Sequence, residues 1–173
     1  MILYLGDREM LEYIQSIYPG VSSEISIEEA DKIIISEHSH ATVSCVRYAD
    51  ENGIPLLGIL DGYKSVAEGF GADCIPVETC SEGKQELAVL DTSAAIHENI
   101  GHVTLICRGD PSALDEETIP PELDCIARAE TGEIISFRKK NTDGNSNIYA
   151  VNYYLNSPLT QCGDIIIKNF TKL

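Results

Sequence analysis

Short apolar runs alternate with amphipathic stretches along the first 70 residues or so of the chain. The apolar runs, bounded by turn residues, predict buried strands of a parallel sheet at Ile2–Leu5, Lys32–Ser36 and Pro55–Ile59. Three stretches between and after these runs predict helices, at Arg8–Ile17, Thr42–Glu51 and Tyr63–Gly69. The first has apolar residues at helical spacing, and the second ends at Asn52-Gly53, a typical helix C-terminus. Strict alternation of strand and helix is typical of a doubly wound α/β domain.

The second half of the chain has a different pattern, with strand-like runs and no long helix between them. The predicted strands are Glu86–Leu90, His102–Cys107, Cys125–Glu130, Glu133–Lys139 and Ile148–Tyr153. The polar segment Lys140–Asn147 predicts an exposed hairpin connection, and Gly163–Leu173 predicts a closing helix. We therefore expect a mostly parallel central sheet with antiparallel additions. Because no internal repeat or linker is visible, we expect residues 1–173 to form one domain.

Composition excludes several classes of partner. The chain is 43% hydrophobic and 23% charged, and its longest apolar runs fall short of the roughly 18 residues that span a bilayer. The N-terminus lacks the basic start and long apolar stretch of a signal peptide, so we expect a cytoplasmic protein. A net charge of −16 repels phosphate backbones and anionic membranes, which argues against nucleic acid or membrane as partners. A basic partner protein or a saline habitat would explain this charge.

The six cysteines do not form a recognisable metal or redox motif. None of them makes a C-x-x-C pair, which argues against a zinc ribbon or a thioredoxin-like site. In a chain without an export signal, we expect them to be small buried hydrophobes. They are Cys45, Cys74, Cys80, Cys107, Cys125 and Cys162.

A nucleophile-elbow pattern lies after the third predicted strand. Residues 53–72 read GIPLLGILDGYKSVAEGFGA, so a strand runs through Gly-x-x-x-Gly directly into a helix. The glycines suit the close backbone packing of such a turn, which exposes one strained residue above a helix N-terminus. Leu60 is the residue at that position.

This segment resembles the G-[IV]-P-[VIL]-L-G-[IV]-C-x-G-x-Q signature of class I glutamine amidotransferases, with leucine at the cysteine position. Residues 148–173, IYAVNYYLNSPLTQCGDIIIKNFTKL, resemble the family's I-Y-G-V-Q-F-H-P-E segment and the G-x-x-[IL]-[LI]-x-N-F tail of the GMP synthase glutaminase. Between the two, residues 84–91 resemble the strand and turn after the elbow helix. Residues 104–110 resemble the strand that leads into S-H-x-D, with Asp110 matching. The resemblance is closest to the glutaminase subunit of GMP synthase, and it implies a flavodoxin-like fold over the whole chain.

The resemblance implies that every member of the family's catalytic triad is replaced here. The cysteine falls on Leu60, the histidine on Tyr154 and the glutamate on Asn156. Leucine has no nucleophilic atom, and tyrosine, with a reference pKa near 10, is a poor base at neutral pH. We therefore expect no glutamine hydrolysis by the family mechanism, and we expect Leu60 and Tyr154 to lie close together in space. Rescue by Cys107 or Cys162 is an alternative, although neither of these cysteines lies on an elbow.

Other positions that serve glutamine chemistry in the family are replaced as well. Lys64 stands where the family has a glutamine-binding glutamine, and Ser36-Glu37-His38-Ser39 stands for the oxyanion loop S-G-G-P. Bulky residues in place of both glycines put the backbone conformation of that hole in doubt.

These replacements bring ionisable residues to the old active-site region, and we expect them to converge near one cleft. The candidate pocket residues are Glu37, His38, His40, Asp61 and Lys64. The pair His38 and His40, with Glu37 or Asp61, has suitable metal-ligand types, but such pairs are more often solvated loop residues, so we expect no metal and no cofactor. Asp61 is expected to stabilise a helix N-terminus. His97 and His102 are expected to be surface and turn residues.

Three functions are compatible with this sequence. The first is an inactive amidotransferase-like protein that acts as a binding or regulatory subunit. Through the resemblance, its partner would be a synthetase such as the ATP-pyrophosphatase subunit of GMP synthase, in purine biosynthesis. The second is an active amidotransferase or hydrolase with a rebuilt site. The third is a free-standing sensor of a small-molecule ligand in the former glutamine pocket.

Overall fold

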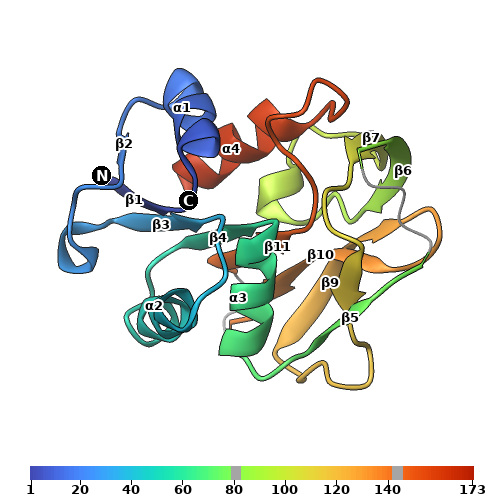
Figure 1. The fold of residues 1–173 in the computed structure, drawn as a ribbon, viewed down its shortest axis with the longest axis horizontal. Helices are drawn as coiled ribbons and strands as arrows, with labels where there is room; N and C mark the ends of the chain where they lie inside the picture. The colour runs from blue at the N-terminus through green and yellow to red at the C-terminus, as the bar shows by residue number, and fades with distance from the viewer. Residues whose placement is uncertain (79–82, 142–145) are drawn as a thin grey trace.

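The computed structural model of the chain describes residues 1–78, 83–141 and 146–173 and shows helices packed on a twisted central sheet (Figure 1). The helices are α1 Arg8–Ile17, α2 His40–Glu51, α3 Asp61–Gly69 and α4 Gly163–Lys172, with short 3₁₀ segments η1 Ile27–Glu29 and η2 Ala95–His97. The strands of the first half are β1 Ile2–Leu5, β2 Val21–Ser22, β3 Lys32–Ile35, β4 Leu56–Ile59 and β5 Cys74–Pro76. Those of the second half are β6 Gln85–Leu90, β7 Val103–Cys107, β8 Ser112–Leu114, β9 Leu123–Ala129, β10 Ile134–Lys139 and β11 Ile148–Val151.

The described strands form one nine-stranded sheet in the order β2-β1-β3-β4-β11-β10-β9-β6-β7, and β5 and β8 form a separate two-stranded sheet. Pairing is parallel from β2 to β11 and antiparallel from β11 to β7. The predicted doubly wound α/β fold with antiparallel additions is therefore confirmed. Strand β4 lies inside the parallel part, which places its carboxyl end, the usual position of a functional site in such sheets, next to β3 and β11.

Helices cover both faces of the parallel part, and each face has its own apolar core (Figure 1). Along β1, Ile2 and Tyr4 join the core under α1 and α4, whereas Leu3 joins the core under α2 and α3. This alternation follows from the two-residue period of a strand. It explains why the parallel strands are apolar at nearly every position: both of their faces are buried.

Local signals agree with most of the predicted elements. Helix α1 begins after Asp7, whose side chain accepts a hydrogen bond from the backbone N–H of Met10, and α2 begins after Ser39, which forms a capping box with Thr42. The structure adds β2, β5 and β8, which the sequence pattern did not predict. Part of the predicted hairpin connection Lys140–Asn147 lies outside the described residues.

The outer edge of β7 is covered by the returning chain that follows β11. The carbonyl of Leu105 accepts a hydrogen bond from the backbone N–H of Gln161, at 3.0 Å. The carbonyl of Cys107 accepts another from the N–H of Tyr154 at 2.9 Å, and its own N–H donates to the hydroxyl of Thr160 at 3.0 Å. These contacts tie the segment that carries Tyr154 to the end of the sheet.

Candidate functional site

Leu60 sits at the sharp turn between β4 and α3, as the elbow pattern predicts. Its backbone has φ 54° and ψ −114°, a combination that residues with a Cβ rarely adopt. The turn is held from both sides, because the N–H of Leu60 donates to the carbonyl of Val151 and its own carbonyl accepts from the N–H of Tyr63, both at 2.9 Å. The chain thus keeps the strained geometry of a nucleophile elbow.

Two glycines flanking Leu60 allow this turn to pack against its neighbours. A Cβ added to Gly58 would lie 2.4 Å from the carbonyl oxygen of Gly62, and one added to Gly62 would lie 1.9 Å from the carbonyl oxygen of Ile35. Both distances are far inside van der Waals contact with backbone atoms. Glycine is therefore required at each position so that α3 can begin directly against β3 and β4.

Leu60, Tyr154 and Asn156, the positions that match the triad, line one small cavity of about 340 Å³. The N-terminal part of α1 forms the opposite wall, with Asp7, Glu9 and Met10, and Ser157 and Pro158 complete the lining. The side-chain amide of Asn156 donates to the carboxylate of Glu9 at 3.4 Å. The cavity therefore contains an aliphatic side chain, a phenol and an amide where the family has thiol, imidazole and carboxylate.

Residues 36–39, at the position of the family's oxyanion loop, form hydrogen bonds with α3. The carbonyl of Glu37 accepts a hydrogen bond from the hydroxyl of Ser65 at 2.9 Å, and the Nε2 of His38 lies 2.7 Å from a carboxylate oxygen of Glu68. Neither Glu37 nor His38 has a positive φ. The loop therefore has an ordinary backbone conformation and exposes its side chains.

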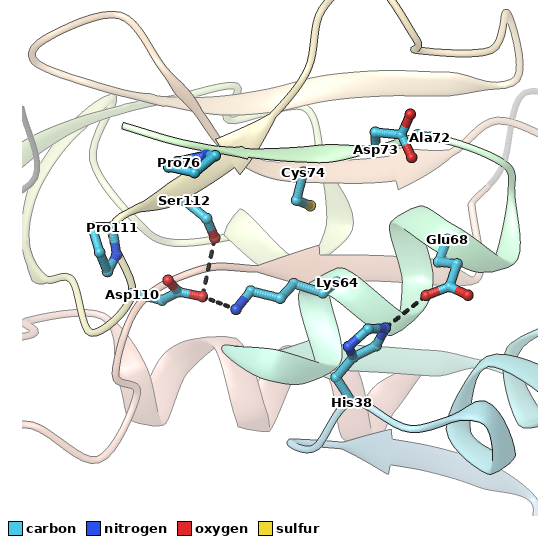
Figure 2. A pocket seen from close by; sticks show the side chains of 10 residues that line it. All are labelled: His38, Lys64, Glu68, Ala72, Asp73, Cys74, Pro76, Asp110, Pro111 and Ser112. Atoms are coloured by element: carbon cyan, nitrogen blue, oxygen red, sulfur yellow. Dashed lines mark hydrogen bonds and ion pairs between the residues drawn. The ribbon is translucent and has the colours of Figure 1, made fainter. Parts of the chain in front are cut away.

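A second and larger cavity, of about 640 Å³, lies between α3, β5 and the connection from β7 to β8 (Figure 2). Lys64 crosses it and forms ion pairs with Asp61 and Asp110, and the hydroxyl of Ser112 donates to Asp110 at 3.0 Å. Burial disfavours the charge of Lys64, but the two carboxylates outweigh this effect and raise the pKa of its ammonium above the ordinary value. Lys64 is therefore a firmly held cation.

The expected convergence of ionisable residues holds only in part. His38 and Lys64 line the larger cavity, and Asp61 is paired with Lys64 at the start of α3. Glu37 and His40 are exposed and line neither cavity. For His40 the reason is that it is the first residue of α2 and no longer part of the loop before that helix.

The larger cavity also contains residues that the sequence pattern did not single out. Glu68, Asp73 and Cys74 belong to its lining. Glu68 could have been found, because it follows Lys64 by four positions and shares its helix face. Asp73 and Cys74 gave no signal, because they lie in and beside the short strand β5.

The remaining histidine and cysteine predictions have mixed outcomes. His97 was expected at the surface, and this was wrong: it is fully buried, with Nδ1 2.9 Å from the carbonyl oxygen of Asp91. Three cysteines are buried as expected, namely Cys45, Cys107 and Cys162, whereas Cys74 and Cys125 are half-buried. Cys80 lies outside the described residues.

The described part of the chain contains neither a metal-binding cluster nor a membrane-spanning helix. No group of three or more histidine, cysteine, aspartate or glutamate residues there could hold a metal ion. None of the helices described is both long and apolar enough to cross a membrane.

Comparison with known proteins connects this geometry to one family. The sequence profile of "Glutamine amidotransferase class-I" matches residues 16–173. The chain is 28% identical over 120 residues to a GMP synthase [glutamine-hydrolyzing] of Campylobacter hominis; the match spans 69% of this chain and 22% of that protein. It is 24% identical over 189 aligned positions to the aminodeoxychorismate/anthranilate synthase component 2 of Bacillus subtilis, covering 98% and 95% of the two chains.

Solved structures agree on the fold. A GMP synthase subunit from Thermoplasma acidophilum superposes with a TM-score of 0.81 at 19% identity, covering 99% of this chain and 92% of that one. A glutamine amidotransferase from Thermotoga maritima superposes with a TM-score of 0.69 at 14% identity, covering 89% and 75%. The profile match extends over most of the sequence and includes the elbow at Leu60 and the segment of Tyr154. The chain belongs to the class I glutamine amidotransferase family.

Proposed function

We propose that this protein does not hydrolyse glutamine and acts as a binding or regulatory subunit. The observation that carries the proposal is Leu60, an aliphatic side chain at a fully formed nucleophile elbow. Amide hydrolysis in this family requires a thiolate that attacks the amide carbon and forms a thioester. A leucine side chain has no atom that can make this bond.

The partners of the missing nucleophile are also unsuited to the chemistry. Tyr154 shares the cavity with Leu60, but a phenol is almost entirely protonated at neutral pH and cannot accept a proton as imidazole does. Asn156 is neutral and donates its amide to Glu9, so it does not supply the charge that would orient a base. In a serine protease, loss of the whole triad costs about 10⁶-fold in kcat, which is the scale of loss we expect here.

Another cysteine is poorly placed to replace the nucleophile. Cys107 and Cys162 are buried, and neither lines the cavity over Leu60. Burial raises the pKa of the Cys162 thiol to about 11, which leaves little thiolate at neutral pH. These observations favour the inactive form over an amidotransferase with a rebuilt cysteine site.

The binding role rests on what the chain has kept. The chain forms the elbow with its two glycines, and Leu60 lines a cavity there, although the positions that match the triad hold other residues. Several relatives are named "component 2" of a synthase, which marks them as one part of a larger enzyme. We infer a synthetase of the ATP-pyrophosphatase type as the partner, because other relatives are GMP synthases. A net charge of −16 favours a basic surface on that partner.

An ammonia-release assay with glutamine tests the proposal, with and without a candidate synthetase partner. We expect no release above background from the unaltered protein, and none from Leu60→Cys alone, because base and carboxylate are still missing. The triple reversion Leu60→Cys, Tyr154→His and Asn156→Glu is expected to show a trace of turnover. Steady turnover by the unaltered protein would overturn the proposal. Co-purification with the synthetase distinguishes a regulatory subunit from a free-standing sensor.

A further inference from the structure

One face of β6 and β7 carries exposed apolar side chains. The strand register places Leu87 opposite Leu105 and Val89 opposite Val103, so these four side chains share a face, and we call them the β6–β7 patch. The intervening Ala88 points to the other face and joins the core under α1 and α4. Val103 is 52% exposed, Val89 42% and Leu87 38%, so the patch presents a continuous aliphatic surface to solvent.

The same face of the sheet is buried where other strands carry it. Helices α2 and α3 pack on it over the parallel strands, and Leu123 of β9 and Phe137 of β10 are buried in that core. Strands β6 and β7 lie at the far end of the sheet, away from both helices (Figure 1). Exposed apolar side chains that are scattered singly are normal on a protein surface, whereas a contiguous group marks an interaction surface.

A hollow of about 520 Å³ adjoins the patch on the side of β9. Val89 and Arg128, which face each other in the register of β6 and β9, both line it, as does Cys125. Asp91 and His102 also belong to the lining. A hollow beside an apolar ridge can accept one bulky side chain of a partner, and such buried anchors supply most of the binding energy at protein interfaces.

Acidic groups border the patch. Glu130 directly follows β9 and is exposed, and its backbone N–H donates to the carbonyl of Leu87 at 2.9 Å, which fixes this residue beside the patch. Arg128 is paired with Glu116, whose carboxylate oxygens lie 2.7 and 3.3 Å from its guanidinium nitrogens. Acidic groups therefore outnumber basic ones at this border, in line with the net charge of −16. A partner that complements this border carries positive charge beside its apolar contact residues.

We propose that the β6–β7 patch is the docking surface for a basic protein partner, with an apolar side chain of the partner in the hollow and a lysine or arginine at Glu130. A second copy of this chain fits less well, because it would bring another net charge of −16 to a border that is already acidic. Docking at this patch rests on the proposed role as a binding or regulatory subunit, and it assigns that role to one surface.

Surface plasmon resonance with the candidate ATP-pyrophosphatase synthetase as the probe is the direct test. Val89→Arg and Val103→Arg each place a bulky cation in the apolar contact and are expected to weaken binding at least about tenfold. Tyr18→Arg is the matched control, because Tyr18 is 39% exposed and lies next to β2, at the opposite end of the sheet. We expect this control to bind like the unaltered protein, and a loss equal to that of the patch variants would refute the inference.

Milder variants keep the test valid if an arginine variant does not fold, as judged by circular dichroism. Val89→Thr combined with Val103→Thr keeps the shape and strand preference of both side chains and removes only apolar surface, so binding should weaken about tenfold. Glu130→Lys should slow association and reduce its salt dependence, with little effect on dissociation. Glu24→Lys makes the same change of charge in an exposed loop beyond β2, and an equal effect there would show attraction to the net charge alone and refute the inference.

The possible outcomes separate the docking surface from the proposed function. If the synthetase binds the unaltered protein and the folded patch variants equally, the docking surface is refuted and the role as a regulatory subunit stands. If the synthetase does not bind the unaltered protein, both are refuted, while ammonia release still decides whether glutamine is hydrolysed. Sedimentation velocity of the protein alone should show a monomer. A dimer that Val103→Arg dissociates would assign the patch to a second copy and refute docking of a basic partner.

Discussion

Leu60 allows the strain of the elbow to be measured with two substitutions, Leu60→Ala and Leu60→Gly. Both remove the half-buried leucine side chain that packs on the core under α1 and α4, so that loss is common to the pair. They differ in the backbone. A residue with a Cβ at φ 54° and ψ −114° carries about 1–3 kcal/mol of strain, whereas glycine reaches the mirror image of an ordinary extended conformation without cost.

The expected order of stability is therefore the reverse of the usual one. Glycine gains more freedom than alanine in the unfolded chain, which costs about 0.4–1 kcal/mol. Relief of strain exceeds this cost at the centre of both ranges, so we expect Leu60→Gly to be more stable than Leu60→Ala by about 1 kcal/mol. For a chain of this length, that corresponds to about 2–4 °C in Tm.

Urea denaturation followed by circular dichroism measures the difference directly, and the slopes of the two transitions should agree. The same pair at an exposed position of α2, Arg47→Ala and Arg47→Gly, is the control, because there alanine should be the more stable by about 1 kcal/mol. If Leu60→Gly were less stable than Leu60→Ala by a similar amount, Leu60 would not be strained and the elbow assignment would lose its physical basis.

Two further predictions concern stability. Gly62→Ala should destabilise the fold by at least about 2 kcal/mol in urea unfolding, because the added Cβ would lie 1.9 Å from the Ile35 carbonyl oxygen. This is the opposite of the usual preference for alanine over glycine in a helix. Gly101→Ala is the control and should change stability little, since the nearest atom to its added Cβ lies at 3.4 Å. Burial lowers the pKa of His97, so the unfolded chain binds its proton more readily than the folded protein does. The contribution of His97 is therefore present above its unfolded pKa and is lost as pH falls through the folded value. Between pH 7.5 and 5.5, unfolding experiments should show a steeper loss of stability in the unaltered protein than in His97→Asn, and equal slopes would refute this assignment.

The elements that the sequence predicted well are those buried on both faces or on one regular face. Strand β3 and helix α1 are examples, because a continuous apolar run and a helical period each leave a direct mark in the sequence. Strand β5 left none, since its three residues include Pro76 and two of them are exposed. His97 was misjudged because the neighbouring turn-like segment Asn99-Ile100-Gly101 suggested a surface position, whereas tertiary packing buries the ring.

The candidate site was predictable only at positions that belong to the two family motifs, around Leu60 and Tyr154. The elbow and the cavity shared by Leu60 and Tyr154 followed from matching two separated motifs. The larger cavity could not be predicted as a whole, because Asp73 and Asp110 are brought towards Lys64 by the pairing of β5 with β8. That pairing depends on tertiary contacts that leave no periodic signal in either segment.

The covered edge of β7 also determines how this protein can associate with others. An open edge strand recruits extended peptides and other sheets by backbone pairing, without regard to most side chains. Here the carbonyls of Leu105 and Cys107 are already used by the chain itself, so this end of the sheet resists both peptide capture and fibre-like growth. Recognition at this end must then rely on side-chain shape and charge, which makes any complex formed there selective and sensitive to single substitutions.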